Sequence, residues 1–207
     1  MILLTNLALA KAPLRALASI KQSARVDHAR ELMGENYKKS VVSNFEKHKG
    51  LEKNIFSTVQ IRLPKAYKKD ARKITETIIE ESTLHGLDPY FVMAVISGES
   101  SFNPLAKGPV GEIGLMQIRF STGVWIADIM KFKWKGEKTL LDPVSNIKLG
   151  TAYLAWLRQK FDNHGQLYLA AYNMGPKSVK KALVKNVWPK DYPRHVMKRY
   201  IAFYRSI

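Results

Sequence analysis

The chain has 207 residues, 46% hydrophobic and 25% charged, which is typical of a folded globular protein and argues against disorder. The 34 Lys and Arg residues outnumber the 17 Asp and Glu residues, and the resulting net charge of +17 indicates an anionic partner such as nucleic acid, anionic lipid or a wall polymer. The lack of cysteine excludes disulfides, a thiolate nucleophile, Cys-based zinc sites and a Cys-linked lipid anchor, and the five histidines lack ligand spacing, so we expect no metal site and no cofactor.

Residues 1–18 begin with an apolar run that is too short to span a bilayer. The run, Met1–Ala10, resembles the hydrophobic region of a secretory signal, and Ala16–Ala18 offers small residues for cleavage. The first basic residues, Lys11 and Arg15, follow the run and do not precede it, so a hydrophobic first turn packed on the domain is the alternative. We expect a signal peptide and export as a soluble protein to the periplasm or cell-wall space.

Residues 19–65 are polar and rich in lysine, with little apolar periodicity. Leu51, Ile55 and Val59 form one weak helical stripe, and Pro64 ends the segment. We interpret this segment as a basic helical N-terminal arm.

Residues 66–207 contain a series of helical patterns and almost no strand signals. Apolar stripes predict five helices in this region. The first covers Ala71–Ile79 and is ended by His85-Gly86, the second starts at Asp142-Pro143 and runs to Phe161, and the third covers Leu167–Tyr172 and is ended by Gly175-Pro176. A fourth helix is predicted to start with Ser178 as its cap, and a fifth covers Val196–Tyr204. The fold class is therefore all-α, a compact domain of several helices with no internal repeat.

One further helix carries a candidate catalytic acid, Glu99. Asp88-Pro89 is a helix-start signal, and Val92, Ile96 and Glu99 then fall on one helical face. Asn103-Pro104 must stop this helix, so Glu99 lies near its C-terminus. Apolar surroundings and the negative end of the helix dipole both disfavour the ionised carboxylate, which is how an acid is kept protonated near neutral pH for general acid catalysis. A surface Glu at a frayed helix end is the alternative.

Three short motifs stand in order along the chain: Glu99-Ser100 with Phe102-Asn103-Pro104, then Gly114–Ile118 (GLMQI), then Ala171–Pro176 (AYNMGP). Together with the run from Leu141 to Leu154 they resemble the soluble-type (SLT, family 1) lytic transglycosylases. The resemblance covers about Ala66 to Ile207 and implies a lysozyme-like fold, α+β at most, with residues 66–207 as the catalytic domain. For residues 19–65, a cover over the substrate cleft is one hypothesis.

The resemblance implies a reaction as well. Such enzymes cleave the β-1,4 bond between N-acetylmuramic acid and N-acetylglucosamine in peptidoglycan without adding water, and they leave a 1,6-anhydro end. An ordinary glycosidase needs two carboxyl groups, whereas substrate-assisted glycosidases are an exception to that rule. Glu99 would first donate a proton to the leaving oxygen and then accept one from the 6-hydroxyl, so one carboxyl suffices.

Matching the motifs implies further site residues. Ser100 and Tyr172 would hydrogen-bond Glu99 or the reacting sugar, Gln117 and Asn173 would bind N-acetyl or hydroxyl groups, and Met116 would form an apolar wall. Each has a structural alternative: Met116 and Tyr172 as core residues, Gln117 as a solvated side chain, and Asn173 as part of a helix end.

Two features depart from the family pattern, and alternative functions remain. Glu112 adds a second carboxylate near the cleft, and Arg119–Thr122 replaces a segment that usually contains proline. If Glu112 or Asp142 positioned a water, a hydrolytic muramidase resembling goose-type lysozyme would result. A non-catalytic glycan-binding or nucleic-acid-binding protein is the other alternative, although no nucleic-acid-binding motif is present. We expect a monomer whose partners are peptidoglycan glycan strands and anionic wall polymers, and we do not expect nucleic acid as a partner.

Overall fold

The structure is a computed structural model that describes residues 17–207, so the predicted signal peptide lies almost entirely outside the described residues. The elements in chain order are α1 (Gln22–Met33), η1 (Gly34–Lys39), α2 (Val41–Asn44), α3 (Leu51–Arg62), η2 (Lys65–Asp70), α4 (Ala71–Leu84), α5 (Pro89–Glu99), β1 (Glu112–Ile113), β2 (Ile118–Arg119), α6 (Phe120–Ile129), α7 (Glu137–Leu141), α8 (Pro143–Lys160), α9 (Gly165–Met174), α10 (Pro176–Val184) and α11 (Asp191–Arg205). The one sheet in this part of the chain is the antiparallel pair β1–β2, so the predicted all-α class is confirmed.

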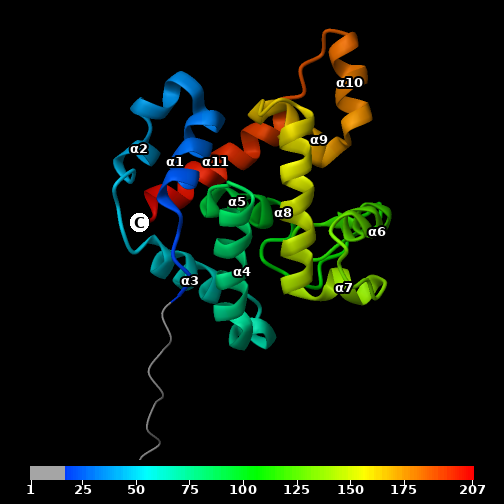
Figure 1. The fold of residues 1–207 in the computed structure, drawn as a ribbon, viewed down its shortest axis with the longest axis horizontal. Helices are drawn as coiled ribbons and strands as arrows, with labels where there is room; N and C mark the ends of the chain where they lie inside the picture. The colour runs from blue at the N-terminus through cyan, green and yellow to red at the C-terminus, as the bar shows by residue number, and fades with distance from the viewer. Residues whose placement is uncertain (1–16) are drawn as a thin grey trace, which may run out of the picture.

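Helix α5 lies at the centre of the fold, with α4, α8 and α11 around it (Figure 1). Its start follows the sequence signal, because Asp88 Oδ1 accepts a hydrogen bond from the Tyr90 amide at 2.9 Å and Pro89 occupies the first turn. Val92 and Ile96 are buried as the stripe predicts, and residues 89–96 are buried on every side of the helix and not on that face alone.

The other predicted helices are present, with one correction. Helices α4, α8, α9 and α11 match the predicted apolar stripes. Ser178 is not a cap, because it lies inside α10. That helix begins at Pro176, whose fixed φ suits a first helical position, after Gly175 at φ +83°. No helix within residues 17–207 is long and apolar enough to cross a membrane.

The segment 19–65 is helical, but it is not a separate arm. Ile20, Val26, Leu51, Ile55 and Val59 are buried in the same apolar core as α5 and α11. In Figure 1 α1 and α2 lie on the left beside the end of α11, and α6 and α7 lie on the opposite side of α4 and α8. The segment therefore contributes to the core of the domain that we had placed in residues 66–207.

Residues 19–65 pack on the core partly through a buried polar network, which is why the apolar periodicity of this segment is weak. Arg25 is only 1% exposed and donates to the Tyr204 hydroxyl at 2.8 Å. The hydroxyls of Tyr200 and Tyr204 both donate to Asp88 Oδ2 at 2.7 Å. Buried polar groups are tolerated when they are hydrogen-bonded in this way. The side chain that caps α5 thus also ties α1 and α11 together.

His28 provides a second tie between α1 and α5. Its Nδ1 accepts the Asp88 amide hydrogen at 3.0 Å, so the ring carries its proton on Nε2, which lies 2.9 Å from the Tyr168 hydroxyl. Complete burial, with Arg158 nearby, lowers the pKa of His28 well below its ordinary value. His28 is therefore neutral in the folded protein.

Candidate active site

A cleft with a volume of about 1010 Å³ is lined by residues from all three motifs, including Glu99, Gln117 and Tyr172. Its walls come from the loop before β1, from β2 and the start of α6, from α8, and from the α9–α10 junction. The lining residues that matter below are Glu99, Gly108, Glu112, Gln117, Arg119, Ser121, Tyr153, Tyr172, Asn173 and Lys177. Within residues 17–207, no residue before Glu99 lines the cleft, which contradicts the hypothesis that residues 19–65 cover it.

Glu99 is the last residue of α5 and is half-buried where the helix meets the cleft. Its Oε1 accepts a hydrogen bond from the Tyr192 hydroxyl, which comes from the first turn of α11. Burial raises the pKa of Glu99 above its ordinary value, and the negative charge of Glu112 adds to this rise. The hydrogen bond from Tyr192 and the positive charge of Arg199 oppose the rise without cancelling it.

Glu112 is the second carboxyl group of the cleft, and its two oxygens are engaged differently from those of Glu99. Oε1 lies 2.9 Å from Arg119 Nε across the β1–β2 pair, and Oε2 accepts the Val110 amide at 3.1 Å. Partial burial alone would raise the pKa of Glu112, but the hydrogen bonds from its own backbone, Arg119 and Val110 outweigh it and lower the pKa. The cleft therefore contains two carboxyl groups whose pKa values are shifted in opposite directions: that of Glu99 is raised and that of Glu112 is lowered.

The loop from Gly114 to Gln117 is clamped by Asn146 of α8. Asn146 is completely buried; its Oδ1 accepts the Met116 amide at 2.7 Å, and its Nδ2 donates to the carbonyls of Ile113 and Leu140 at 2.9 and 2.8 Å. Gly114 must lack a side chain here, because it has φ +81° and a Cβ would collide with Asn146. Asn146 belongs to the run from Leu141 to Leu154 that resembles the family, and its role is to hold the loop of the second motif in place.

Met116, Ser100 and Tyr172 hold this loop from the other sides. Met116 is 0% exposed and packs against Gly150, where a Cβ would collide with the Met116 sulfur. The Ser100 hydroxyl donates to the Leu115 carbonyl at 2.8 Å, and the Tyr172 hydroxyl donates to the Met116 carbonyl at 2.7 Å. The hydroxyls of Ser100 and Tyr172 thus bond this loop and not Glu99, and Met116 does not line the cleft. Contacts of Ser100 and Tyr172 with the reacting sugar stay predictions.

Gln117 projects from the clamped loop into the cleft. Its backbone is left-handed, at φ +48°, a conformation that an L-residue adopts at some cost. Nε2 donates to the carbonyls of Ala106 and Gly114, both at 3.0 Å, which fixes the amide and leaves Oε1 close to Gly108. A Cβ on Gly108 would lie 2.8 Å from that oxygen, so the glycine makes room for it.

The structure brings Gln117, Tyr172 and Asn173 to the cleft wall with Glu99, and their roles toward a substrate stay predictions. Asp142 is not among the lining residues; it caps α8 by accepting the Ser145 amide at 2.9 Å. No group of three or more His, Asp or Glu within residues 17–207 is arranged to hold a metal ion.

Two site residues were missed from the sequence. Tyr192 bonds Glu99 from 93 residues further along the chain, and nothing in the local pattern around it signals this contact. Tyr153 lines the cleft beside Tyr172, with ring centroids 5.5 Å apart. Tyr153 lies within the run from Leu141 to Leu154 that resembles the family, and this position could have identified it as a site residue.

The sequence model of the Transglycosylase SLT domain family matches residues 76–194. A "Putative soluble lytic murein transglycosylase" of Haemophilus influenzae is 35% identical over 125 residues, which are 60% of this chain and 20% of that protein. A "Membrane-bound lytic murein transglycosylase C" of Edwardsiella ictaluri is 34% identical over 131 residues, 59% of this chain and 36% of that protein. This chain thus matches only a fifth to about a third of the length of these relatives.

The fold has a counterpart among solved structures. The 70 kDa soluble lytic transglycosylase SLT70 of Escherichia coli superimposes with a TM-score of 0.57 at 23% identity, over 92% of this chain and 38% of that one. At this identity the likeness concerns the fold, and it extends over the N-terminal segment as well as the region with the three motifs.

Proposed function

Because the chain belongs to the Transglycosylase SLT domain family, we propose that it is a lytic transglycosylase that cleaves the β-1,4 MurNAc–GlcNAc bond of peptidoglycan without water. The observation that carries the proposal is Glu99, a half-buried acid with a raised pKa at the edge of a large cleft. Such an acid stays protonated to a higher pH than a surface glutamate, which suits a general acid.

Tyr192 determines which oxygen of Glu99 reacts. Its hydroxyl donates to Oε1, so the proton that Glu99 delivers is carried on Oε2. Glu99 gives this proton to the glycosidic oxygen as the bond to the anomeric carbon breaks. The substrate's 2-acetamido group stabilises the positive charge that develops at that carbon.

The second half of the reaction uses the same carboxyl. The 6-hydroxyl oxygen of the muramic acid bonds to its own anomeric carbon, and the Glu99 carboxylate takes the hydroxyl proton. This closes the 1,6-anhydro ring and returns Glu99 to its protonated form. The nucleophile is part of the substrate and already oriented, so it has a high effective molarity relative to water.

The cleft residues then have separate tasks. Gln117 and Asn173 bind hydroxyl or N-acetyl groups of the glycan, and the ring of Tyr172 lies against a sugar while its hydroxyl holds the Met116 loop. Ser100 and Met116 act from below by fixing that loop. Arg119 and Lys177, which also line the cleft, suit a substrate whose stem peptides and lactyl groups carry carboxylates.

The site of action follows from the substrate. Peptidoglycan glycan strands lie outside the cytoplasmic membrane, so we place the protein in the periplasm or cell-wall space, as a monomer. Its charge of +17 favours the anionic wall as a partner, and no nucleic acid is needed to account for it.

A hydrolytic muramidase is the second candidate, because Glu112 lines the same cleft as Glu99. Hydrolysis with inversion would need Glu112 to activate a water as a general base. Against this, both oxygens of Glu112 already accept hydrogen bonds, one of them from Arg119.

The experiment that separates the two is digestion of purified peptidoglycan, followed by mass spectrometry of the muropeptides. Three proteins are compared: the wild type, Glu99→Gln and the matched control Glu112→Gln. We expect products one water lighter than hydrolysis gives, lost with Glu99→Gln and retained with Glu112→Gln. Reducing ends that disappear with Glu112→Gln would establish the muramidase, and full activity of Glu99→Gln would reject both mechanisms.

A further inference from the structure

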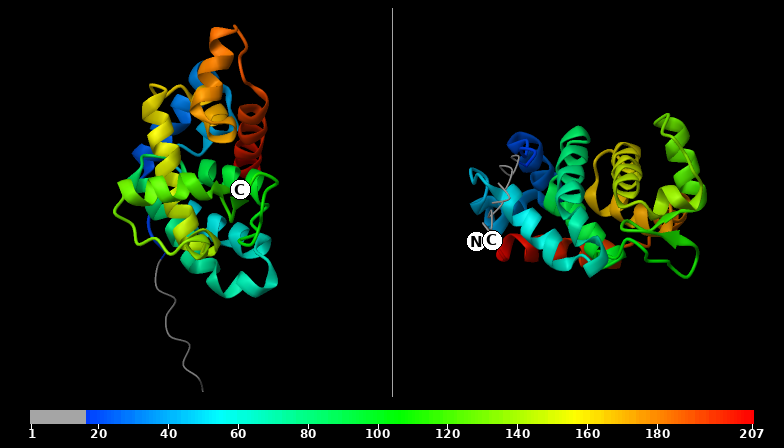
Figure 2. Two further views of the ribbon diagram at one scale, coloured as in Figure 1. Left: turned by 90° about the vertical axis from the view of Figure 1, so that its right-hand side faces the viewer. Right: turned by 90° about the horizontal axis from the view of Figure 1, so that it is seen from below.

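Helix α10 and the loop after it form an exposed tip at the edge of the molecule. Figures 1 and 2 show α10 at the edge of the molecule, where its base packs against α9. Val179 is the one fully buried residue of α10, and Lys177, Lys180, Lys181 and Val184 are exposed. We call residues 176–190 the α10 tip.

The α10 tip exposes apolar side chains that a soluble surface normally hides. Val184 is 86% exposed, Val187 56% and Trp188 52%, and the three lie within five consecutive positions. Trp188 rests against His164 at 5.8 Å between ring centroids, so the indole has a packed partner on one side and solvent on the other. Exposed apolar groups gathered in this way usually mark an interaction site.

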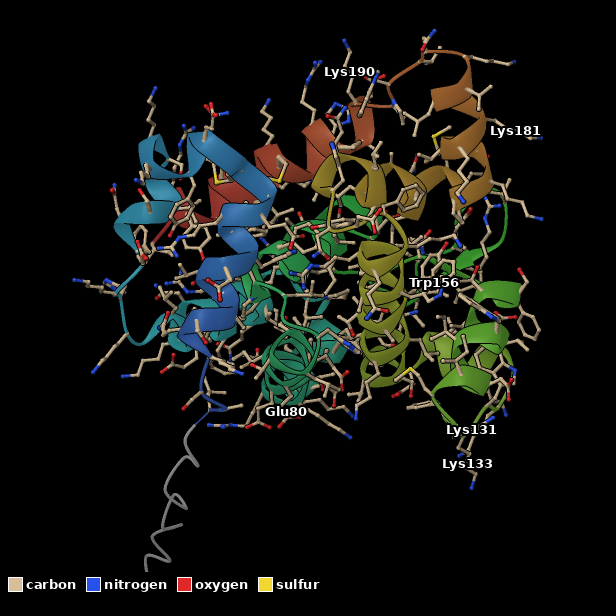
Figure 3. All side chains as sticks on the ribbon, turned by 45° about the horizontal axis from the view of Figure 1, so that its top comes forward. Glu80, Lys131, Lys133, Trp156, Lys181 and Lys190 are labelled. Atoms are coloured by element: carbon tan, nitrogen blue, oxygen red, sulfur yellow. The ribbon has the colours of Figure 1, made fainter. Side chains whose placement is uncertain are left out.

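The same tip is strongly basic. Residues 176–190 contain Lys177, Lys180, Lys181, Lys185 and Lys190 and neither Asp nor Glu. Figure 3 shows Lys181 on α10 and Lys190 beyond the loop that follows it. Lysines thus flank the apolar residues along the chain, and the net charge of the tip is positive.

We propose that the α10 tip docks on an anionic lipid surface. Lysines bind the headgroup phosphates, and Val184, Val187 and Trp188 enter the boundary between headgroups and acyl chains. Trp is favoured at this depth, and apolar residues flanked by Lys are typical of segments that bind in the membrane interface. Each lysine near an anionic bilayer strengthens such binding.

Two other occupants fit the tip less well. A second copy of the chain would bring another +17 charge and an equally basic tip, so the two would repel. A wall polymer would match the charge, but it has no apolar phase in which Val184, Val187 and Trp188 could be removed from water. Of these three occupants, the bilayer alone matches both the positive charge and the exposed apolar side chains.

Docking would place the cleft close to the membrane. Pro176 and Lys177, at the base of α10, line the cleft, and Val184 ends the same helix. The nine residues of α10 span about 13 Å at 1.5 Å per residue. A docked protein would therefore hold its cleft within about 13 Å of the headgroups.

The test is flotation of the whole chain with vesicles of phosphatidylcholine alone or mixed with phosphatidylglycerol. We expect binding to the anionic vesicles only, weakened by salt. Lys180→Gln, Lys181→Gln and Lys185→Gln should each weaken it roughly fivefold, and the triple variant Val184→Ser, Val187→Ser, Trp188→Ala by roughly tenfold or more. The matched control is Ile61→Ser with Leu84→Ser, which removes two apolar residues that are 74% and 70% exposed on α3 and α4.

Three results would overturn the proposal. These are no binding to the anionic vesicles, equal loss in the control variant, or loss with the lysine variants alone, which would indicate an anionic polymer and not a bilayer. None of the substituted residues lines the cleft, so cleavage of purified peptidoglycan fragments should be unchanged in all variants. A lack of vesicle binding would therefore not contradict the proposed catalytic function, and a lack of peptidoglycan cleavage would not contradict the proposed membrane docking.

Discussion

Replacing Asn146 by alanine should destabilise the fold and damage the cleft together. The substitution removes three hydrogen bonds, to the Met116 amide and to the carbonyls of Ile113 and Leu140, from a completely buried position. A buried backbone group left without a partner costs about 1–3 kcal/mol. Partial compensation by water still leaves a loss of roughly 3 kcal/mol in the free energy of unfolding, or roughly 6–12 °C in Tm for a chain of this size.

Urea unfolding and cleavage of peptidoglycan fragments, measured on the same preparations, would check this prediction. The loop that Asn146 holds carries Gln117, so kcat/KM should fall even at temperatures where Asn146→Ala remains folded. Gln159→Ala is the matched control, because Gln159 is an exposed residue of the same helix and its loss should stay within about 0.5 kcal/mol. A cost below about 1 kcal/mol together with normal activity would refute the role of the clamp.

Three further predictions concern proton equilibria and the N-terminal segment. Tyr192→Phe removes a hydrogen bond that favours the carboxylate of Glu99, so the pKa of Glu99 should rise further and the loss of kcat/KM on the alkaline side should move to higher pH; an unchanged pH profile would contradict this. The pKa of His28 is lowered below its ordinary 6.5 in the folded protein, so below about pH 6.5 the unfolded chain binds a proton at His28 and the folded chain does not. The free energy of unfolding should then fall by up to about 1.4 kcal/mol per pH unit below about pH 6.5, and less steeply in His28→Gln; equal slopes in urea titrations would count against it. A chain that starts at Ala66 should lose cooperative thermal unfolding, because it lacks core residues such as Leu51 and Ile55; a sharp transition with full activity would show that residues 19–65 are dispensable.

Local signals were enough to find the helix of the candidate acid and the acid itself. Asp88 and Pro89 begin α5 in the structure as in the sequence, and Glu99 is its last residue. The helix ends before the predicted stop at Asn103-Pro104, because the backbone turns left-handed at Ser101 and Phe102. Tyr192 could not be found in this way. Its contact with Glu99 depends on how α11 crosses α5, and no sequence spacing encodes that crossing.

The order of the motifs located the cleft, but it did not tell which side chains face it. Gln117 and Met116 are adjacent, yet one lines the cleft and the other is buried against Gly150. The left-handed backbone at Gln117 turns the two side chains apart, and a single chain gives no periodic signal for such a loop.

The N-terminal segment was misjudged because part of its packing is polar. Arg25 and His28 are 1% and 0% exposed, although their types are usually found at the surface. Their burial depends on Asp88, Tyr168 and Tyr204, which lie at least 60 residues further along the chain. Counting apolar residues could not reveal these partners.

The central claim, cleavage by Glu99 without added water, is tested most directly by digesting peptidoglycan in water labelled with heavy oxygen. If the 6-hydroxyl of the substrate is the nucleophile, the new anhydro ends will carry none of the label. Incorporation of one labelled oxygen per cut would show that water is the nucleophile, and it would contradict the proposed reaction.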